Sequence, residues 1–157
     1  SLFAKQWQKT LLYYPQYNYA ISHPIDASIR EAYEENNRHL EEVAARTLSH
    51  TWGLLFFYRG ENPLALQYAP TVQSFADRYG FALIGVSMDG KKAPGLSHNQ
   101  MNHGQAQHLH IQYLPALVLV NPKTQKAIPL AYGYLSSNQL LKAVNTASHD
   151  LQRRSHS

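Results

Sequence analysis

The apolar positions of this chain are spaced in two different ways, and the change comes near residue 50. In the N-terminal part, apolar residues recur every three or four positions, which predicts a short amphipathic helix over residues 2–13. The residues that make this pattern are Leu2, Phe3, Trp7, Leu11 and Leu12. A tyrosine-rich link follows between Pro15 and Pro24, where we expect no helix.

A second helical pattern begins near Ser28, which has capping-box spacing to Glu31. One face of this helix is apolar and is weakest at Asn36 and Asn37; it consists of Ile29, Tyr33, Leu40, Val43, Ala44 and Leu48. We expect the apolar face to pack against the rest of the protein. The acidic residues would then face solvent or a basic partner, namely Glu34, Glu35, Glu41 and Glu42.

From Trp52 onward the pattern predicts the order β-α-β-α-β-β-α. The first strand is apolar on both faces, as a central strand covered on two sides must be. Pro129 is compatible only with an edge strand or a bulge. We expect a loop over 91–101, strands over 52–58, 81–88, 114–120 and 127–134, and helices over 63–79, 102–110 and from Ser136. This divides the chain into an N-terminal helical arm (1–49), an α/β domain (50–149) and a frayed polar tail (150–157).

The amino-acid composition limits the reactions and ligands that the chain can support. The chain has no cysteine, which excludes disulfides, thiolate metal sites and thiol redox catalysis. Its net charge is +4, but the basic residues are scattered and form no nucleic-acid motif. No run of 18 apolar residues is present, so the sequence predicts no membrane insertion. The chain opens with Ser1 and shows no signal peptide, which suggests an excised domain or a mature fragment.

The order of the predicted elements resembles thioredoxin, with a strand, a short turn, a helix that contains a proline and a later strand entered at an X-Pro pair. In that superfamily the Cys-x-x-Cys motif opens the helix, and a proline lies five residues after its second cysteine. Counting back from Pro70 places the segment Asn62, Pro63, Leu64 and Ala65 at the redox motif. Leu114-Pro115 matches the cis-proline that faces this motif across a groove. The resemblance implies a thioredoxin-like α/β fold, with a central mixed sheet flanked by helices.

A more specific resemblance runs from about Phe3 to Val144. Several strings in order resemble the TraF family of F-type conjugative type IV secretion systems, among them FAKQWQKTLL, LLFFYRGENP, FADRYGFALIGVSMDG and LPALVLVNPKT. The resemblance implies a non-catalytic periplasmic assembly protein, without a cofactor, that is required for pilus biogenesis. It also implies association with TraH and neighbouring secretion components, and an upstream segment with a signal peptide outside this chain.

Each candidate site residue has a structural alternative. Asn62 either serves only as the N-cap of a helix or belongs to a surviving protein-binding groove with Leu114 and Pro115. The aromatic residues of the arm either bind a partner or fold back on the domain; they are Trp7, Tyr13, Tyr14, Tyr17 and Tyr19.

A group of histidines suggests a second hypothesis for the function of the chain. Four histidines lie within thirteen residues, which raises a periplasmic chaperone or a metal-dependent enzyme on a thioredoxin-like scaffold as the second functional hypothesis. They are His98, His103, His108 and His110. The segment has no Asp, Glu or Cys to complete a coordination sphere, so surface histidines are the favoured interpretation and no metal site is predicted.

Overall fold

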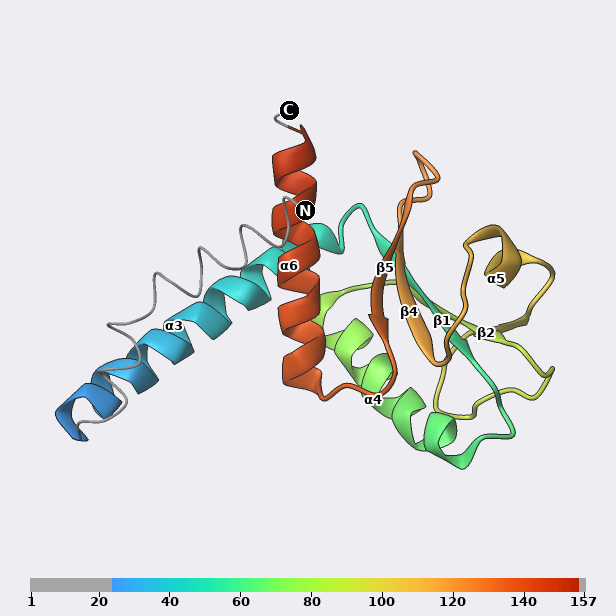
Figure 1. The fold of residues 1–157 in the computed structure, drawn as a ribbon, viewed down its shortest axis with the longest axis horizontal. Coiled ribbons are helices and arrows are strands. Elements are labelled where there is room, and N and C mark those ends of the chain that lie inside the picture. Colours follow the sequence, from blue (N-terminus) through green and yellow to red (C-terminus); the bar gives the residue numbers. More distant parts are fainter. Residues whose placement is uncertain (1–23, 156–157) are drawn as a thin grey trace. The chain divides into compact units, whose positions relative to one another are not determined.

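The structure is a computed structural model that describes residues 24–155 (Figure 1). It comprises two compact units, Ser1–Leu40 and Glu41–Ser157, which are described separately. Helix α3 spans Pro24–Leu48. Its residues 24–40 are the described part of the first unit, and its last two turns belong to the second unit. The assignment of an arm over 1–49 and a domain over 50–149 stays a prediction.

The second unit contains a mixed sheet with the strand order β3-β2-β1-β4-β5 within the described residues. Strands β1, β2 and β3 are parallel, whereas β4 is antiparallel to both β1 and β5. The strands are β1 Gly53–Tyr58, β2 Leu83–Ser87, β3 Asn99–Met101, β4 Ala116–Val120 and β5 Ala127–Tyr132. The helices after α3 are α4 Pro63–Tyr79, α5 Gln105–His108 and α6 Ser137–Ser155. The mixed sheet flanked by helices confirms the predicted fold class.

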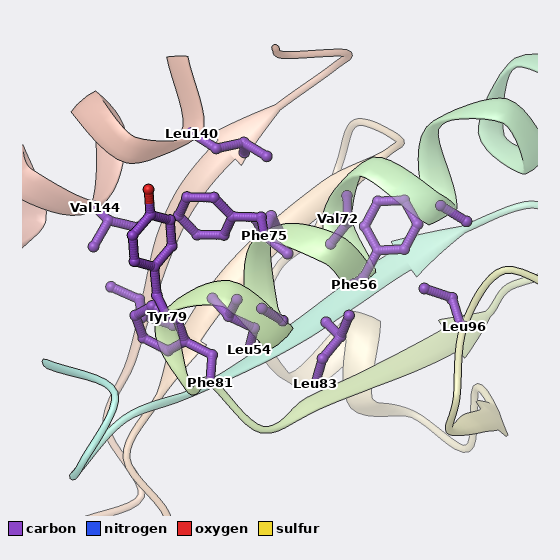
Figure 2. Packing of buried hydrophobic residues seen from close by; sticks show 14 of the residues in the cluster. Leu54, Phe56, Val72, Phe75, Tyr79, Phe81, Leu83, Leu96, Leu140 and Val144 are labelled. Atoms are coloured by element: carbon purple, nitrogen blue, oxygen red, sulfur yellow. The ribbon is translucent and has the colours of Figure 1, made fainter. Parts of the chain in front are cut away.

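Strand β1 separates two apolar clusters, because successive side chains of a strand point to opposite faces. Leu54, Phe56 and Tyr58 pack with residues of α4 and α6 in the larger cluster, which Figure 2 shows from close by. Leu55 and Phe57 face the other cluster, which is covered by α5 and the segment that follows it. The central strand is therefore covered on both sides, as its sequence predicts.

Several boundaries match the predictions closely. Helix α4 spans the predicted 63–79, begins with Pro63 in its first turn and ends at Gly80, whose φ of 84° is a left-handed cap. Strand β5 is an edge strand, and Pro129 lies beside a register shift, where Leu130 is the extra residue. Both positions tolerate a proline, since neither requires a complete ladder of backbone hydrogen bonds.

Three local predictions were wrong. The loop expected over 91–101 contains the short edge strand β3, which pairs with β2. The helix expected over 102–110 is reduced to α5, Gln105–His108. The tail expected to fray after His149 continues as helix α6 to Ser155. Leu151 explains this continuation, because its half-buried side chain packs against the larger cluster.

Helix α3 also differs from its prediction. It begins at Pro24, so the Ser28–Glu31 pair lies inside the helix and does not cap it. Most of the face predicted to be buried is exposed, with fractions of 64% at Ile29 and 57% at Leu40. Tyr33 and Val43 are similarly exposed, at 48% and 47%.

The contact of α3 is centred on another face. Ala45, which was not in the predicted face, is buried in the larger cluster, and so is Leu48, which was. The side chains of Glu41 and Glu42, predicted to face solvent or a basic partner, are only 16% and 18% exposed and form ion pairs within the second unit. The pairs are Glu41 with Lys142, and Glu42 with Arg46 and Arg78, at 3.7–3.8 Å.

Two leucine substitutions test this orientation. Leu140 is fully buried in the larger cluster, so Leu140→Ala removes packed methyl groups and should lower the free energy of unfolding by about 2–5 kcal/mol. Leu40→Ala should lower it clearly less than Leu140→Ala does, because Leu40 is 57% exposed and does not belong to the larger cluster. Urea unfolding of both variants would measure the difference. A loss for Leu40→Ala as large as that for Leu140→Ala would contradict the orientation of α3.

Candidate functional site

The site begins at the N-terminus of α4, where Asn62 is the N-cap. Its backbone is extended, with φ −83° and ψ 116°, and its Oδ1 accepts a hydrogen bond of 3.0 Å from the N–H of Leu64. Pro63 follows in the first turn, where its missing N–H costs nothing. Asn62 and Leu64 are exposed, whereas Ala65 is buried.

A second contact of Asn62 was not foreseen from the sequence. Its Nδ2 donates to the hydroxyl of Tyr134 at 3.3 Å, just beyond strand β5. The ring of Tyr134 lies edge-on against Tyr68 of α4, with centroids 5.3 Å apart. Tyr68 is buried, which raises the pKa of its hydroxyl, and the nearby backbone of Leu135 offsets this only in part. Among the described residues, that hydroxyl has no partner of ordinary hydrogen-bonding geometry.

Leu114-Pro115 is a cis peptide bond, as predicted, and Pro115 is buried at the entry to β4. The carbonyl oxygen of Pro115 accepts a hydrogen bond of 2.8 Å from the N–H of Gly133. Gly133 immediately precedes Tyr134, which contacts Asn62. The end of β5 therefore joins the two segments that the sequence analysis singled out, the start of α4 and the Leu114-Pro115 pair.

Large side chains are exposed around this junction. Tyr113 is 68% exposed, and its ring lies edge-on against that of Tyr132, with centroids 6.1 Å apart. We use the name aromatic patch for four exposed side chains, which are three tyrosines and one leucine: Tyr113, Tyr132, Tyr134 and Leu64. All four side chains are uncharged. Among the described residues, no hydrogen bond joins the backbone N–H or C=O of Leu114, beside the patch, to another group.

The chemistry available here is limited by the residue types. Asn62 carries a carboxamide and Ala65 a methyl group, so neither side chain can form or break a disulfide. The four candidate histidines, His98, His103, His108 and His110, are all exposed. Over residues 24–155 they join no group of three or more His, Asp or Glu side chains that could hold a metal ion.

Asp89 holds the loop that leads into Asn62. Its Oδ1 accepts hydrogen bonds from the N–H groups of Gly60 and Lys91 and from the Ser87 hydroxyl, each at 3.0 Å. Its Oδ2 accepts from the N–H of Glu61 at 2.9 Å. Partial burial raises the pKa of this carboxyl, but the four hydrogen bonds outweigh burial and hold it well below the usual range.

The approach of the two loops at Asp89 requires glycine at position 60. A Cβ added to Gly60 would lie 1.9 Å from the carbonyl oxygen of Lys91. Beyond the Asp89-Gly90 turn, no sequence signal points to this clamp, because two of its four donors, the N–H groups of Gly60 and Glu61, lie 29 and 28 residues away along the chain. The remaining predicted site residues lie outside the described part of the chain: Trp7, Tyr13, Tyr14, Tyr17 and Tyr19.

The Asp89 clamp predicts a pH dependence of stability. A lowered pKa in the folded state means that the carboxylate stabilises the fold above its unfolded pKa of about 3.9, and that this contribution is lost as the pH falls below that value. Asp89→Asn should lower the free energy of unfolding by about 1.5–3 kcal/mol at pH 7, and by progressively less below pH 4. Urea unfolding of both proteins from pH 7 to pH 2 would measure it. A difference that does not change with pH would contradict the clamp.

Comparison with solved structures finds thioredoxin-like domains. The N-terminal domain of PilB from Neisseria gonorrhoeae is 21% identical, with a TM-score of 0.48 over 68% of this chain and 83% of that domain. The exposed lipoprotein thioredoxin of Streptococcus pneumoniae is 13% identical, with a TM-score of 0.49 over 65% and 89%. The chain itself has the thioredoxin-like α/β arrangement, without its cysteines. No helix within residues 24–155 has both the length and the apolar character needed to cross a bilayer.

Sequence comparison gives the family. Residues 1–144 match the family described as TraF, F plasmid transfer operon protein. Protein TraF of Escherichia coli K12 is 35% identical over 153 residues, which cover 96% of this chain and 61% of that protein. The chain thus spans about three fifths of the length of this relative. From the match over residues 1–144 and the 35% identity to the E. coli protein, we conclude that this chain belongs to the TraF family of F plasmid transfer operon proteins.

Proposed function

We propose that the chain is a non-catalytic assembly component of a conjugative type IV secretion system, that it acts in the periplasm, and that it is needed for pilus biogenesis. The observation that carries the proposal is the state of the former redox site. We place Asn62 and Ala65 where the fold family has its thiols, and the four side chains of the aromatic patch beside them are exposed and uncharged. A surface that has no thiols but has exposed aromatic side chains is suited to binding another protein.

The aromatic patch is the proposed contact surface. Tyrosines present a large apolar ring and a polar hydroxyl, and they are among the residue types that dominate protein interfaces. The backbone groups of Leu114 lie beside the patch and can pair with an extended segment as an added strand. The absence of charge from the four side chains favours an uncharged segment of the partner.

The partner proposed from the family resemblance is TraH, together with neighbouring secretion components. The match covers 61% of the E. coli relative. The partners of that longer protein are therefore assigned to this chain only as a proposal. The aromatic residues of 7–19 remain candidates for a second contact with the same partner.

Substitution of Asn62 tests the patch. Asn62→Arg places a long charged side chain at the exposed helix start and should weaken binding to the TraH of the same system at least tenfold. Gln100→Arg, on edge strand β3 at the opposite side of the sheet, adds the same charge and should leave binding unchanged. Calorimetric titration would measure both affinities, with thermal unfolding as the control for folding.

Two results would count against the proposal in different ways. Equal affinity for Asn62→Arg, for Tyr113→Ser and for the unsubstituted chain would move the interface away from the patch. Normal pili on cells that lack the gene would contradict the assembly role itself.

The helix start also predicts what two restored thiols would do. Residues 62 and 65 are three apart at a helix N-terminus, where Cα atoms lie about 5–6 Å from each other and a disulfide can close. Asn62→Cys with Ala65→Cys should lose both free thiols on mild oxidation, as thiol titration would show, whereas each single variant should keep one thiol per chain. The unsubstituted chain should reduce no insulin disulfide, since it has no thiolate. A double variant that keeps two free thiols would contradict this geometry.

A further inference from the structure

Helix α3 carries an exposed apolar stripe that the proposed function does not use. We define the stripe as Ile29, Tyr33, Leu40 and Val43, which are between 47% and 64% exposed. The intervals between these residues are four, seven and three, so they follow one line along the helix, with Asn36 at the intermediate position. Such a narrow line at alternating intervals of three and four residues is the seam that a second helix covers in a coiled coil.

The stripe lies on the side of α3 opposite the residues that pack. Each residue turns an α-helix by about 100°, which places Val43 and Leu40 roughly 140–160° from Ala45. Ala45 and Leu48 are buried, and the side chains of Glu41 and Glu42 are mostly buried in ion pairs. Ala45 and Leu48 belong to the larger cluster, and none of the four stripe residues does.

We propose that the stripe is the docking site for residues 2–13 of this same chain. These residues have apolar side chains at helical spacing, which is the pattern that a seam requires of its second helix. As a helix they would extend about 18 Å, against about 17 Å between Ile29 and Leu40. Residues 14–23 provide the connection, and ten residues are enough to reverse the direction of the chain.

Charge distinguishes this occupant from a second copy of the chain. Residues 1–23 contain Lys5 and Lys9 and no acidic residue. Helix α3 contains six acidic residues and three arginines, so its net charge is negative. The segment and the helix attract each other, whereas two copies of α3 would bring like charges together. The connection also keeps the segment near the stripe, which gives it an advantage in effective concentration over any free partner.

Tryptophan fluorescence tests the docking in the full chain. The protein has two tryptophans, so Trp52→Phe leaves Trp7 as the only reporter. Trp7 should be quenched several-fold less by acrylamide than it is in a synthetic peptide of residues 1–14. Leu40→Asp should return the quenching to the value of the peptide. Arg38→Gln, exposed on the opposite face of α3, makes the same charge change and should have no effect.

A second pair of variants leaves α3 itself untouched. Lys5→Glu with Lys9→Glu should also expose Trp7, because the segment would then repel the acidic helix. Quenching of Trp7 equal to that of the peptide in the unsubstituted chain would overturn the inference. So would protection that survives Leu40→Asp and Ile29→Asp. Protection that disappears on dilution, with a doubled mass in sedimentation, would assign the stripe to a second copy instead.

Discussion

Both faces of strand β1 must be covered, since its residues after Gly53 are apolar in unbroken succession. This constraint requires one layer on each side of the sheet, and α4 with α6 provides the larger one. Burial of a single large apolar side chain contributes roughly 1.5–3 kcal/mol, so the paired clusters around β1 dominate the stability of the second unit. The register of the neighbouring strands β2 and β4 then fixes where α4 begins and where Pro115 lies.

The candidate site depends on where the sheet places the start of α4 and Pro115 more than on the residue types found there. Asn62 is held from three directions: by its cap on Leu64, by the hydroxyl of Tyr134 and by the loop that Asp89 clamps. None of these contacts requires a thiol. The start of α4 is therefore held in place without any cysteine. The proposed binding role needs only this placement and no thiol chemistry.

Helix α3 shows how charge can reverse an assignment made from hydrophobicity. Its apolar face was the natural choice for burial, yet its acidic face packs, because Glu41 and Glu42 find Lys142 and Arg78 on α6 and α4. Partly exposed ion pairs contribute little individually, so the burial of Ala45 and Leu48 on the same face completes the contact. The apolar stripe takes no part in this contact, as the proposed docking of residues 2–13 requires.

The sequence by itself determined the order of the elements, the bounds of α4, the edge position of Pro129 and the absence of thiol chemistry. These follow from local periodicity, from proline geometry and from composition, which need no knowledge of distant residues. The tertiary structure alone decided the contact of Asn62 with Tyr134, the clamp at Asp89 and the face of α3 that packs. Periodicity tells which side chains share a face, but only the assembled fold decides which face meets a neighbour. Hydrogen bonds between residues 28 to 72 positions apart exist only after the sheet has brought those residues together.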